Sequence, residues 1–184
     1  MRETFHASQW VSFPVELVFA FFANPGNFPH LMPKWQQARI ESSRLIAPPP
    51  RPIATDPALR YQSPAAGVGS EMMVSFRPIA RVPFRTRWLA RITEFAWNSH
   101  FCDEQLKGPF VSWTHLHGIV SEARDGLPGT SITDQVEYTL PFGALGSMAN
   151  ALFVRRRLES TFAYRRERLE AILPVALKQA SRRN

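Results

Sequence analysis

The stretch CDEQLKGPFVSWTHLH, from Cys102 to His117, holds two runs of alternating side chains on either side of Gly108-Pro109. Alternation with a period of two is typical of β-strands, and so short a connection favours two antiparallel neighbours. The same stretch carries two acids, an amide, a tryptophan and two histidines. We therefore expect a hairpin with one face whose polar side chains can take part in binding or catalysis.

The strand pattern continues on both sides of this hairpin. Short turns separate runs at 71–79, 84–95, 99–107, 110–121 and 130–140, and earlier strands are expected at 4–11 and 35–43. Short connections predict an antiparallel sheet. Between the first two strands we expect a helix with Ser12 as N-cap that ends at Asn24-Pro25-Gly26, then a second short helix at 27–32.

Apolar residues recur every three to four positions near the C-terminus, which predicts a long helix from Leu145 or Gly146 to about Leu173. Pro174 should weaken or end it, so residues 175–184 are expected to be a flexible tail. Residues 44–69 contain six prolines, which exclude a central strand or a helix interior. We expect this segment to be a loop, either a lid or a disordered insert.

The composition is that of one globular domain spanning residues 1–184. Hydrophobic residues make up 45% of the chain and charged residues 20%, and no apolar run is long enough to span a bilayer. The N-terminus lacks the apolar segment of a signal peptide, and Cys102 is the single cysteine, so we expect a cytoplasmic protein without disulfides.

The formal net charge is +7, and six arginines fall between Arg155 and Arg168. They are not interleaved with aromatic residues, and no nucleic-acid-binding motif is present, so we expect no nucleic-acid partner. A solvated face is the plainest interpretation of Arg155, Arg156 and Arg157. The alternatives are a weak contact with an anionic membrane surface or with a partner protein.

The order of elements predicts an α+β fold in which a curved antiparallel sheet wraps around the long helix and leaves a cavity between them. Three segments also resemble a known family: VFAFFANPGNFPHLMP, FCDEQLKGPFVSWTHLH and GTSITDQVEYTLPFGALG. They resemble the SRPBCC superfamily of START-related helix-grip proteins, in its bacterial branch of ligand-binding and polyketide cyclase/dehydrase-like members. That resemblance covers residues 4–173 and implies a helix-grip fold with a pocket for hydrophobic molecules.

Alternation along the strands predicts which side chains face this cavity. The arginines in the strand at 84–95 mark its wet face, which turns Trp88 inward. The predicted ligand-binding residues are Trp88, Phe101, Asp103, Gln105, Trp113, His115, His117, Asp134 and Tyr138. Aromatic bulk around a polar cluster suits an amphipathic ligand with one oxygenated end. The alternatives are a buried polar ladder that fixes strand register, or acid–base catalysis.

A metal site is not expected from the sequence. His115, His117, Glu122 and Gly129 nearly fit the first cupin motif, but no histidine follows His117 to complete that site. Asp103 or Asp134 would have to supply a third ligand of another kind. We expect no metal and no cofactor, and no nucleophile is marked.

The favoured function is therefore binding of a small hydrophobic or amphipathic molecule of lipid-, polyketide- or aromatic-like character. Two alternatives stay open. One is a cyclase, dehydrase or isomerase that uses His115, His117 and Asp134, and the other is a protein-interaction module that acts through the basic C-terminal helix. The sequence identifies neither a catalytic residue nor an oligomeric state.

Overall fold

The computed structural model describes residues 2–54, 56, 59, 63–81, 83–141 and 153–181. Seven strands form one antiparallel sheet with the order β1-β7-β6-β5-β4-β3-β2. Their bounds are β1 Arg2–Val11, β2 Arg39–Arg44, β3 Glu71–Phe76, β4 Thr86–Ala96, β5 His100–Lys107, β6 Ser112–Ser121 and β7 Thr130–Thr139. The predicted strands are all present, and consecutive strands from β3 to β7 are neighbours, as the short connections indicated, while β2 pairs with β3 across the proline-rich segment.

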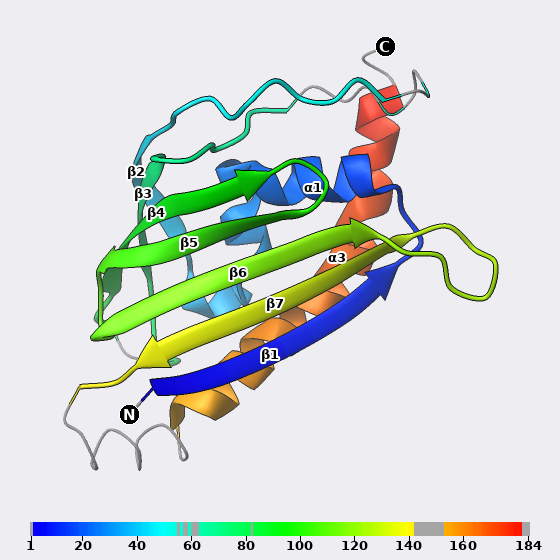
Figure 1. Ribbon diagram of the computed structural model, residues 1–184. Helices are drawn as coiled ribbons and strands as arrows, with labels where there is room; N and C mark the ends of the chain where they lie inside the picture. The colour runs from blue at the N-terminus through cyan, green and yellow to red at the C-terminus, as the bar shows by residue number, and fades with distance from the viewer. Residues whose placement is uncertain are drawn as a thin grey trace.

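The helices lie together on one side of this sheet (Figure 1). Helix α1 (Val15–Ala23) contacts β6, and the long helix α3 (Arg155–Ser181) contacts β1 and α1. Two 3₁₀ helices, η1 (Pro25–Leu31) and η2 (Lys34–Gln36), connect α1 to β2. The sheet therefore has one covered face and one open face, and the predicted helix-grip architecture is confirmed.

Irregular pairing bends the sheet around α3. The register shifts between Ile40 and Ser42 in β2 and at two places in β4, between Leu89 and Ala90 and between Ile92 and Glu94. Each bulge adds a residue on one strand and increases the local twist. The curvature opens space between the middle of the sheet and the helix.

Two apolar clusters hold the helices against the sheet. The larger joins α1 to β5, β6, β7 and α3 through side chains that include Phe19, Phe101, Ile119, Ile132 and Leu169. The smaller joins β1, β7 and α3 and consists of Phe5, Val136, Tyr138 and Phe162. The clusters fix both ends of the sheet–helix interface and leave the polar residues of β5 and β6 between them.

Several predicted boundaries differ from the structure. Ser12 is not the N-cap of α1, because the helix starts at Val15 and Pro14 takes the capping position without a side-chain hydrogen bond. The second short helix is a 3₁₀ helix rather than an α-helix, with Pro29 inside it, and it begins at Pro25. The predicted start of the long helix near Leu145 or Gly146 lies outside the described residues.

The predicted end of the long helix is wrong. Helix α3 continues through Pro174 to Ser181, so 175–181 is helix and not a frayed tail. Leu173 is fully buried in the larger cluster and Leu169 nearly so, with Ile172 packed against them. This packing carries the helix past a residue whose missing N–H would otherwise break it. No helix in the described part of the chain is long and apolar enough to cross a membrane.

The proline-rich segment forms no strand after Arg44 in its described parts, and Leu59 lies in a 3₁₀ turn in which its N–H donates to Asp56 O. Its two ends lie side by side, because Gly67 N donates to Ile46 O and Ile46 N donates to Ser70 Oγ. The indole of Trp97 donates to Pro49 O at 2.7 Å and carries Arg51 over its ring. The absence of sheet pairing agrees with the proline content.

Candidate functional site

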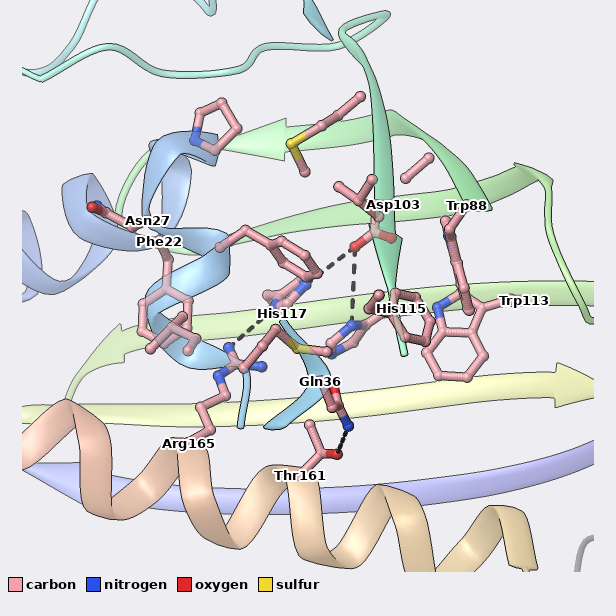
Figure 2. Close-up of a pocket in the computed structure, with 18 of the residues that line it drawn as sticks. Phe22, Asn27, Gln36, Trp88, Asp103, Trp113, His115, His117, Thr161 and Arg165 are labelled. Atoms are coloured by element: carbon pink, nitrogen blue, oxygen red, sulfur yellow. Dashed lines mark hydrogen bonds and ion pairs between the residues drawn. The ribbon is translucent and has the colours of Figure 1, made fainter. Parts of the chain in front are cut away.

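A cavity of about 440 Å³ lies between the concave sheet face and helices α1 and α3. One end is aromatic: the centroids of Trp88 and Trp113 are 4.9 Å apart at 87°, and Phe110 packs against both. Figure 2 shows Trp88 and Trp113 at one end, Phe22 and Arg165 at the other, and Asp103, His115 and His117 between them. The cavity is thus mostly apolar, with a polar group on its wall.

Six of the nine predicted ligand-binding residues line this cavity. They are Trp88, Phe101, Asp103, Trp113, His115 and His117. Their inward orientation follows from the strand alternation, because β5 and β6 pair with Asp103 opposite His115 and Phe101 opposite His117. The predicted face of the sheet is therefore the one that meets the cavity.

The other three predicted residues do not line it. The Gln105 amide donates to Phe110 O at 2.8 Å and accepts from Phe110 N, so it braces the β5–β6 turn. Tyr138 is buried in the smaller cluster beneath Phe110 and Trp113. Asp134 lies behind the two histidines, where it is their hydrogen-bond partner.

The polar group is a buried network centred on Asp134. Its Oδ1 lies 2.9 Å from His115 Nε2, 3.1 Å from His117 Nδ1 and 3.1 Å from Arg165 Nη1. Because an ionised carboxylate only accepts hydrogen bonds, His115 presents its Nε2–H to Asp134. This arrangement fixes the tautomer of His115 and the orientation of both rings from behind.

Asp103 faces the same imidazoles from the other side. Its Oδ2 lies 3.2 Å from His117 Nε2 and 4.0 Å from His115 Nδ1. The ring of Phe101 stacks on His117 with a centroid distance of 4.2 Å and a tilt of 17°. With 19% of its side chain exposed, Asp103 is the more accessible of the two aspartates. One carboxylate thus holds the histidines in place, and the other borders the cavity.

The network shifts the ionisation of its members in opposite directions. Burial would raise the pKa of Asp134, but the Arg165 guanidinium and the two imidazoles hold that pKa well below its ordinary value. Burial lowers the pKa of His115, and the neighbouring His117 lowers it further. Burial acts against His117 as well, but hydrogen bonds to Asp103 and Asp134 outweigh it and raise the pKa. The surroundings therefore favour the protonated form of His117 over that of His115.

Arg165 is a site residue that the sequence interpretation missed. It lies in the cavity wall, 9% exposed, with its guanidinium 4.5 Å from the centroid of Phe22. Its Nη2 lies 3.4 Å from His117 Nδ1, where the guanidinium donates to the ring nitrogen in the tautomer protonated at Nε2. A signal was present: Leu158, Phe162, Arg165 and Leu169 follow helical spacing, which places Arg165 on the buried stripe.

Gln36 was also missed. It is 5% exposed, it lines the cavity from η2, and its amide donates to Thr161 Oγ1 at 3.3 Å. Its Oε1 is buried without a hydrogen-bond partner among the described residues. An unpaired buried acceptor is costly, so this oxygen is well placed to receive a donor from a bound molecule. The sequence interpretation placed Gln36 in the expected strand at 35–43, but that strand begins only at Arg39 and Gln36 lies in η2.

The basic stretch of α3 divides into separate environments. Arg155 pairs with Glu159 at 3.4 Å, and Arg156 is exposed. Arg157 stacks over Trp35 at 4.7 Å and lines the cavity. Arg165 belongs to the buried network. The six arginines therefore do not form one solvated face.

Three solved structures share this fold across nearly their whole length. Norcoclaurine synthase from Thalictrum flavum, a point mutant in complex with a transition-state analogue, aligns with a TM-score of 0.58 at 14% identity over 97% of this chain and 96% of its own. The protein TTHA0849 from Thermus thermophilus gives 0.56 at 16% identity over 95% and 99%. Ara h 8.0201 gives 0.52 at 15% identity over 93% and 99%. At these identities the likeness establishes the fold alone.

No curated protein matches the sequence. A family profile does: the one described as polyketide cyclase/dehydrase and lipid transport matches residues 11–165, from the end of β1 to Arg165 in α3. The match includes the whole cavity wall from Phe21 to Arg165, with strand β6 that carries both histidines and strand β5 that carries Asp103. The helix-grip sheet, the cavity and this match together assign the chain to the polyketide cyclase/dehydrase and lipid transport family of the SRPBCC superfamily.

Proposed function

We propose that the protein binds one small hydrophobic or amphipathic molecule in the cavity between the sheet and α3. The observation that carries this proposal is a cavity of about 440 Å³ whose walls are mostly apolar and aromatic. Ligand pockets of drug-sized molecules have this size and composition. Family membership supports small-molecule binding in general, and the chemistry of the walls suggests the kind of molecule.

The aromatic end favours a planar or branched apolar body. The edge-to-face pair of Trp88 and Trp113 leaves ring surface for a ligand to pack against, with Phe110 beside it. Burying apolar ligand surface is worth about 25 cal/mol per Å². The apolar part of the ligand thus supplies most of the affinity in this proposal.

The polar wall would orient the ligand. Asp103 and Gln36 Oε1 are acceptors on the cavity wall, and both suit a hydroxyl or amine donor on the ligand. His115 and His117 are held rigidly behind this surface by Asp134. A preorganised polar group of this kind selects one ligand orientation without having to rearrange.

The segment at 44–69 is proposed as a lid. Leu45 and Ala66, from its two ends, border the cavity. Closure of such a segment over a ligand would exclude water from the site.

An enzyme of the cyclase, dehydrase or isomerase type is the second candidate. It is favoured by the juxtaposition of two imidazoles, with ring centroids 3.7 Å apart, and a carboxylate on one cavity wall. Such groups suit proton transfer to and from a bound substrate. Turnover of a substrate, lost in a variant that still binds it, would separate this candidate from simple carriage.

The binding proposal is tested by titration with a fluorescent fatty-acid probe and with anilinonaphthalene sulfonate. We expect saturable binding with one probe per chain, accompanied by quenching of tryptophan emission. Ala90 lines the cavity from β4, so Ala90→Trp should fill it and abolish saturable binding. Arg87 is exposed and lies on the opposite face of β4, so Arg87→Trp is the matched control and should bind as the wild type does. Equal binding by both variants would reject this cavity as the site.

A further inference from the structure

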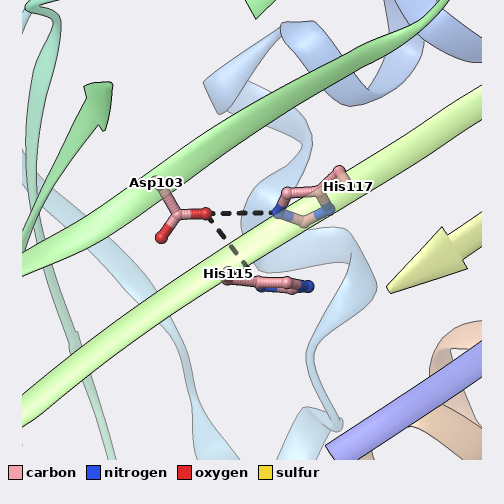
Figure 3. Close-up of side chains that lie close together, drawn as sticks. All are labelled: Asp103, His115 and His117. Carbon is pink, nitrogen blue, oxygen red and sulfur yellow. Dashed lines mark hydrogen bonds and ion pairs between the residues drawn. The ribbon is translucent and has the colours of Figure 1, made fainter. Parts of the chain in front are cut away.

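Asp103, His115 and His117 bring three ligating side chains to one point on the cavity wall (Figure 3). One ligating atom from each lies within 4.8 Å of the other two. The geometry comes from the sheet: the histidines are two residues apart on one face of β6, and Asp103 of β5 is paired opposite His115. The sequence left the third ligand open between Asp103 and Asp134, and the strand register supplies Asp103.

In each imidazole, one ring nitrogen faces away from Asp103 and lies next to Asp134. His115 Nε2 donates to Asp134 Oδ1 at 2.9 Å, and His117 Nδ1 lies 3.1 Å from the same oxygen and 3.4 Å from Arg165 Nη2. A metal-bound histidine almost always donates its second ring N–H to a carboxylate or carbonyl in this way. The near nitrogens, His115 Nδ1 and His117 Nε2, are then the ones turned toward Asp103.

His117 Nε2 lies 3.2 Å from Asp103 Oδ2, a distance that suits either an N–H donated to the carboxylate or a cation held between the two atoms. The same cation would also serve His115 Nδ1, which is 4.0 Å from the same oxygen and too distant for a hydrogen bond to it. A shared cation satisfies both nitrogens, whereas a proton satisfies one.

We propose that Asp103, His115 and His117 bind a single divalent transition-metal ion at the cavity wall. Two imidazole nitrogens and one carboxylate oxygen suit zinc, iron, cobalt or nickel in the divalent state, and not calcium or magnesium, which favour oxygen ligands. Metal–ligand bonds of about 2.1 Å place neighbouring ligand atoms about 3.0–3.4 Å apart. The His117–Asp103 distance fits, and binding would draw His115 in by about 0.6 Å.

The surroundings match those of a metal centre with open positions. Asp134 and Arg165 form a buried ion pair behind the histidines, and Phe101 stacks on His117, so the rings are held before any ion arrives. The three ligands all line the cavity, so the remaining coordination positions would face it. A divalent ion with one carboxylate ligand keeps a charge of about +1, which favours an anionic oxygen such as a phenolate, enolate or carboxylate on the bound molecule.

The site is tested by metal binding to purified, chelator-treated protein. We expect one equivalent of Zn²⁺ per chain by calorimetry, and visible absorption bands with Co²⁺. Asp103→Asn and His117→Gln should abolish stoichiometric binding. Asp134→Asn should weaken it by about 10- to 100-fold, because Asp134 orients the ligands without touching the ion. His6 and His30 are exposed, so the double variant His6→Gln/His30→Gln is the control and should bind as the wild type does.

A readout on the wild-type protein covers the case in which a variant does not fold. Addition of Zn²⁺ should shift the ring ¹⁵N resonances of His115 and His117 and leave those of His6, His30 and His100 in place. Binding that survives in Asp103→Asn and is lost in His6→Gln/His30→Gln would overturn the proposal in favour of surface binding. Failure to bind, with His117 found as an imidazolium by NMR, would overturn it in favour of a proton. Neither result bears on probe binding, which is measured separately.

Discussion

Replacing Arg165 by methionine should destabilise the protein strongly, because it removes the guanidinium that balances the buried charge of Asp134. The guanidinium lies 3.1 Å from Asp134 Oδ1, and both side chains are about one-tenth exposed or less. Coulomb's law at an effective dielectric constant of about 20 gives roughly 5 kcal/mol for this separation. Methionine keeps the apolar stem against Phe22 and Phe162, so the loss is mainly electrostatic.

Breaking a buried pair by removing one partner costs about 3–5 kcal/mol. In a chain of this length each kcal/mol lowers the melting temperature by about 2–4 °C, so a fall of roughly 6–20 °C is expected. Urea unfolding followed by circular dichroism measures the free energy directly. Arg156→Met is the control, because Arg156 is exposed on the same helix and should change the free energy of unfolding by less than about 0.5 kcal/mol.

The pH dependence separates charge from packing. The folded-state pKa of Asp134 is held below the unfolded value, so its contribution to stability is present above the unfolded pKa and is lost as pH falls through the folded pKa. Without Arg165 the pKa of Asp134 rises, and the aspartate takes up a proton at higher pH. The deficit of Arg165→Met should therefore be largest near pH 7 and narrow toward pH 4. A deficit that is independent of pH, or equal to that of Arg156→Met, would refute this reasoning.

Three further outcomes follow from the site. His115→Gln keeps a donor toward Asp134 and should change the affinity for a neutral probe by less than about tenfold, or 1.4 kcal/mol. His115→Leu should lose about 1–3 kcal/mol of binding free energy, because it leaves Asp134 without that donor. Equal affinities of the two variants would show that His115 does not shape the site. Gln36→Leu removes a buried unpaired oxygen, so calorimetry should show weaker binding of a hydroxylated ligand, and the free energy of unfolding should not fall. A lower free energy of unfolding with unchanged ligand affinity would count against this role. Burial raises the pKa of the Cys102 thiol, so iodoacetamide at pH 8 should label native protein far more slowly than urea-unfolded protein, and equal rates would contradict its burial.

The fold was predictable because its signals are local. Strand alternation around Gly108-Pro109 identified the inward face of β5 and β6, and the register then placed Asp103 opposite His115 as that face required. The prediction that the helix ends near Pro174 was wrong because the burial of Leu173 outweighs this local helix breaker. That burial depends on residues far away in the sequence.

The site was predictable only in part, because its contents depend on packing between distant segments. Alternation identifies a face of a strand but not its distance from the cavity, so Gln105 and Tyr138 were assigned to the site although one braces a turn and the other lies beneath two aromatic rings. Arg165 was treated only as one of the six arginines of the basic stretch, although its position in the buried stripe of the helix places its side chain inside the protein. The role of Asp134 depended on Arg165 and could not be inferred without it.

Native mass spectrometry of freshly purified protein would show directly whether the cavity holds a ligand. A fraction of the chains should carry one co-purifying small molecule, which is released on denaturation and is absent from Ala90→Trp purified in parallel. Chelator treatment beforehand distinguishes this mass from that of a bound ion. Wild-type protein that is empty, and that also shows no saturable binding of either fluorescent probe, would contradict the proposal that this cavity is a ligand site.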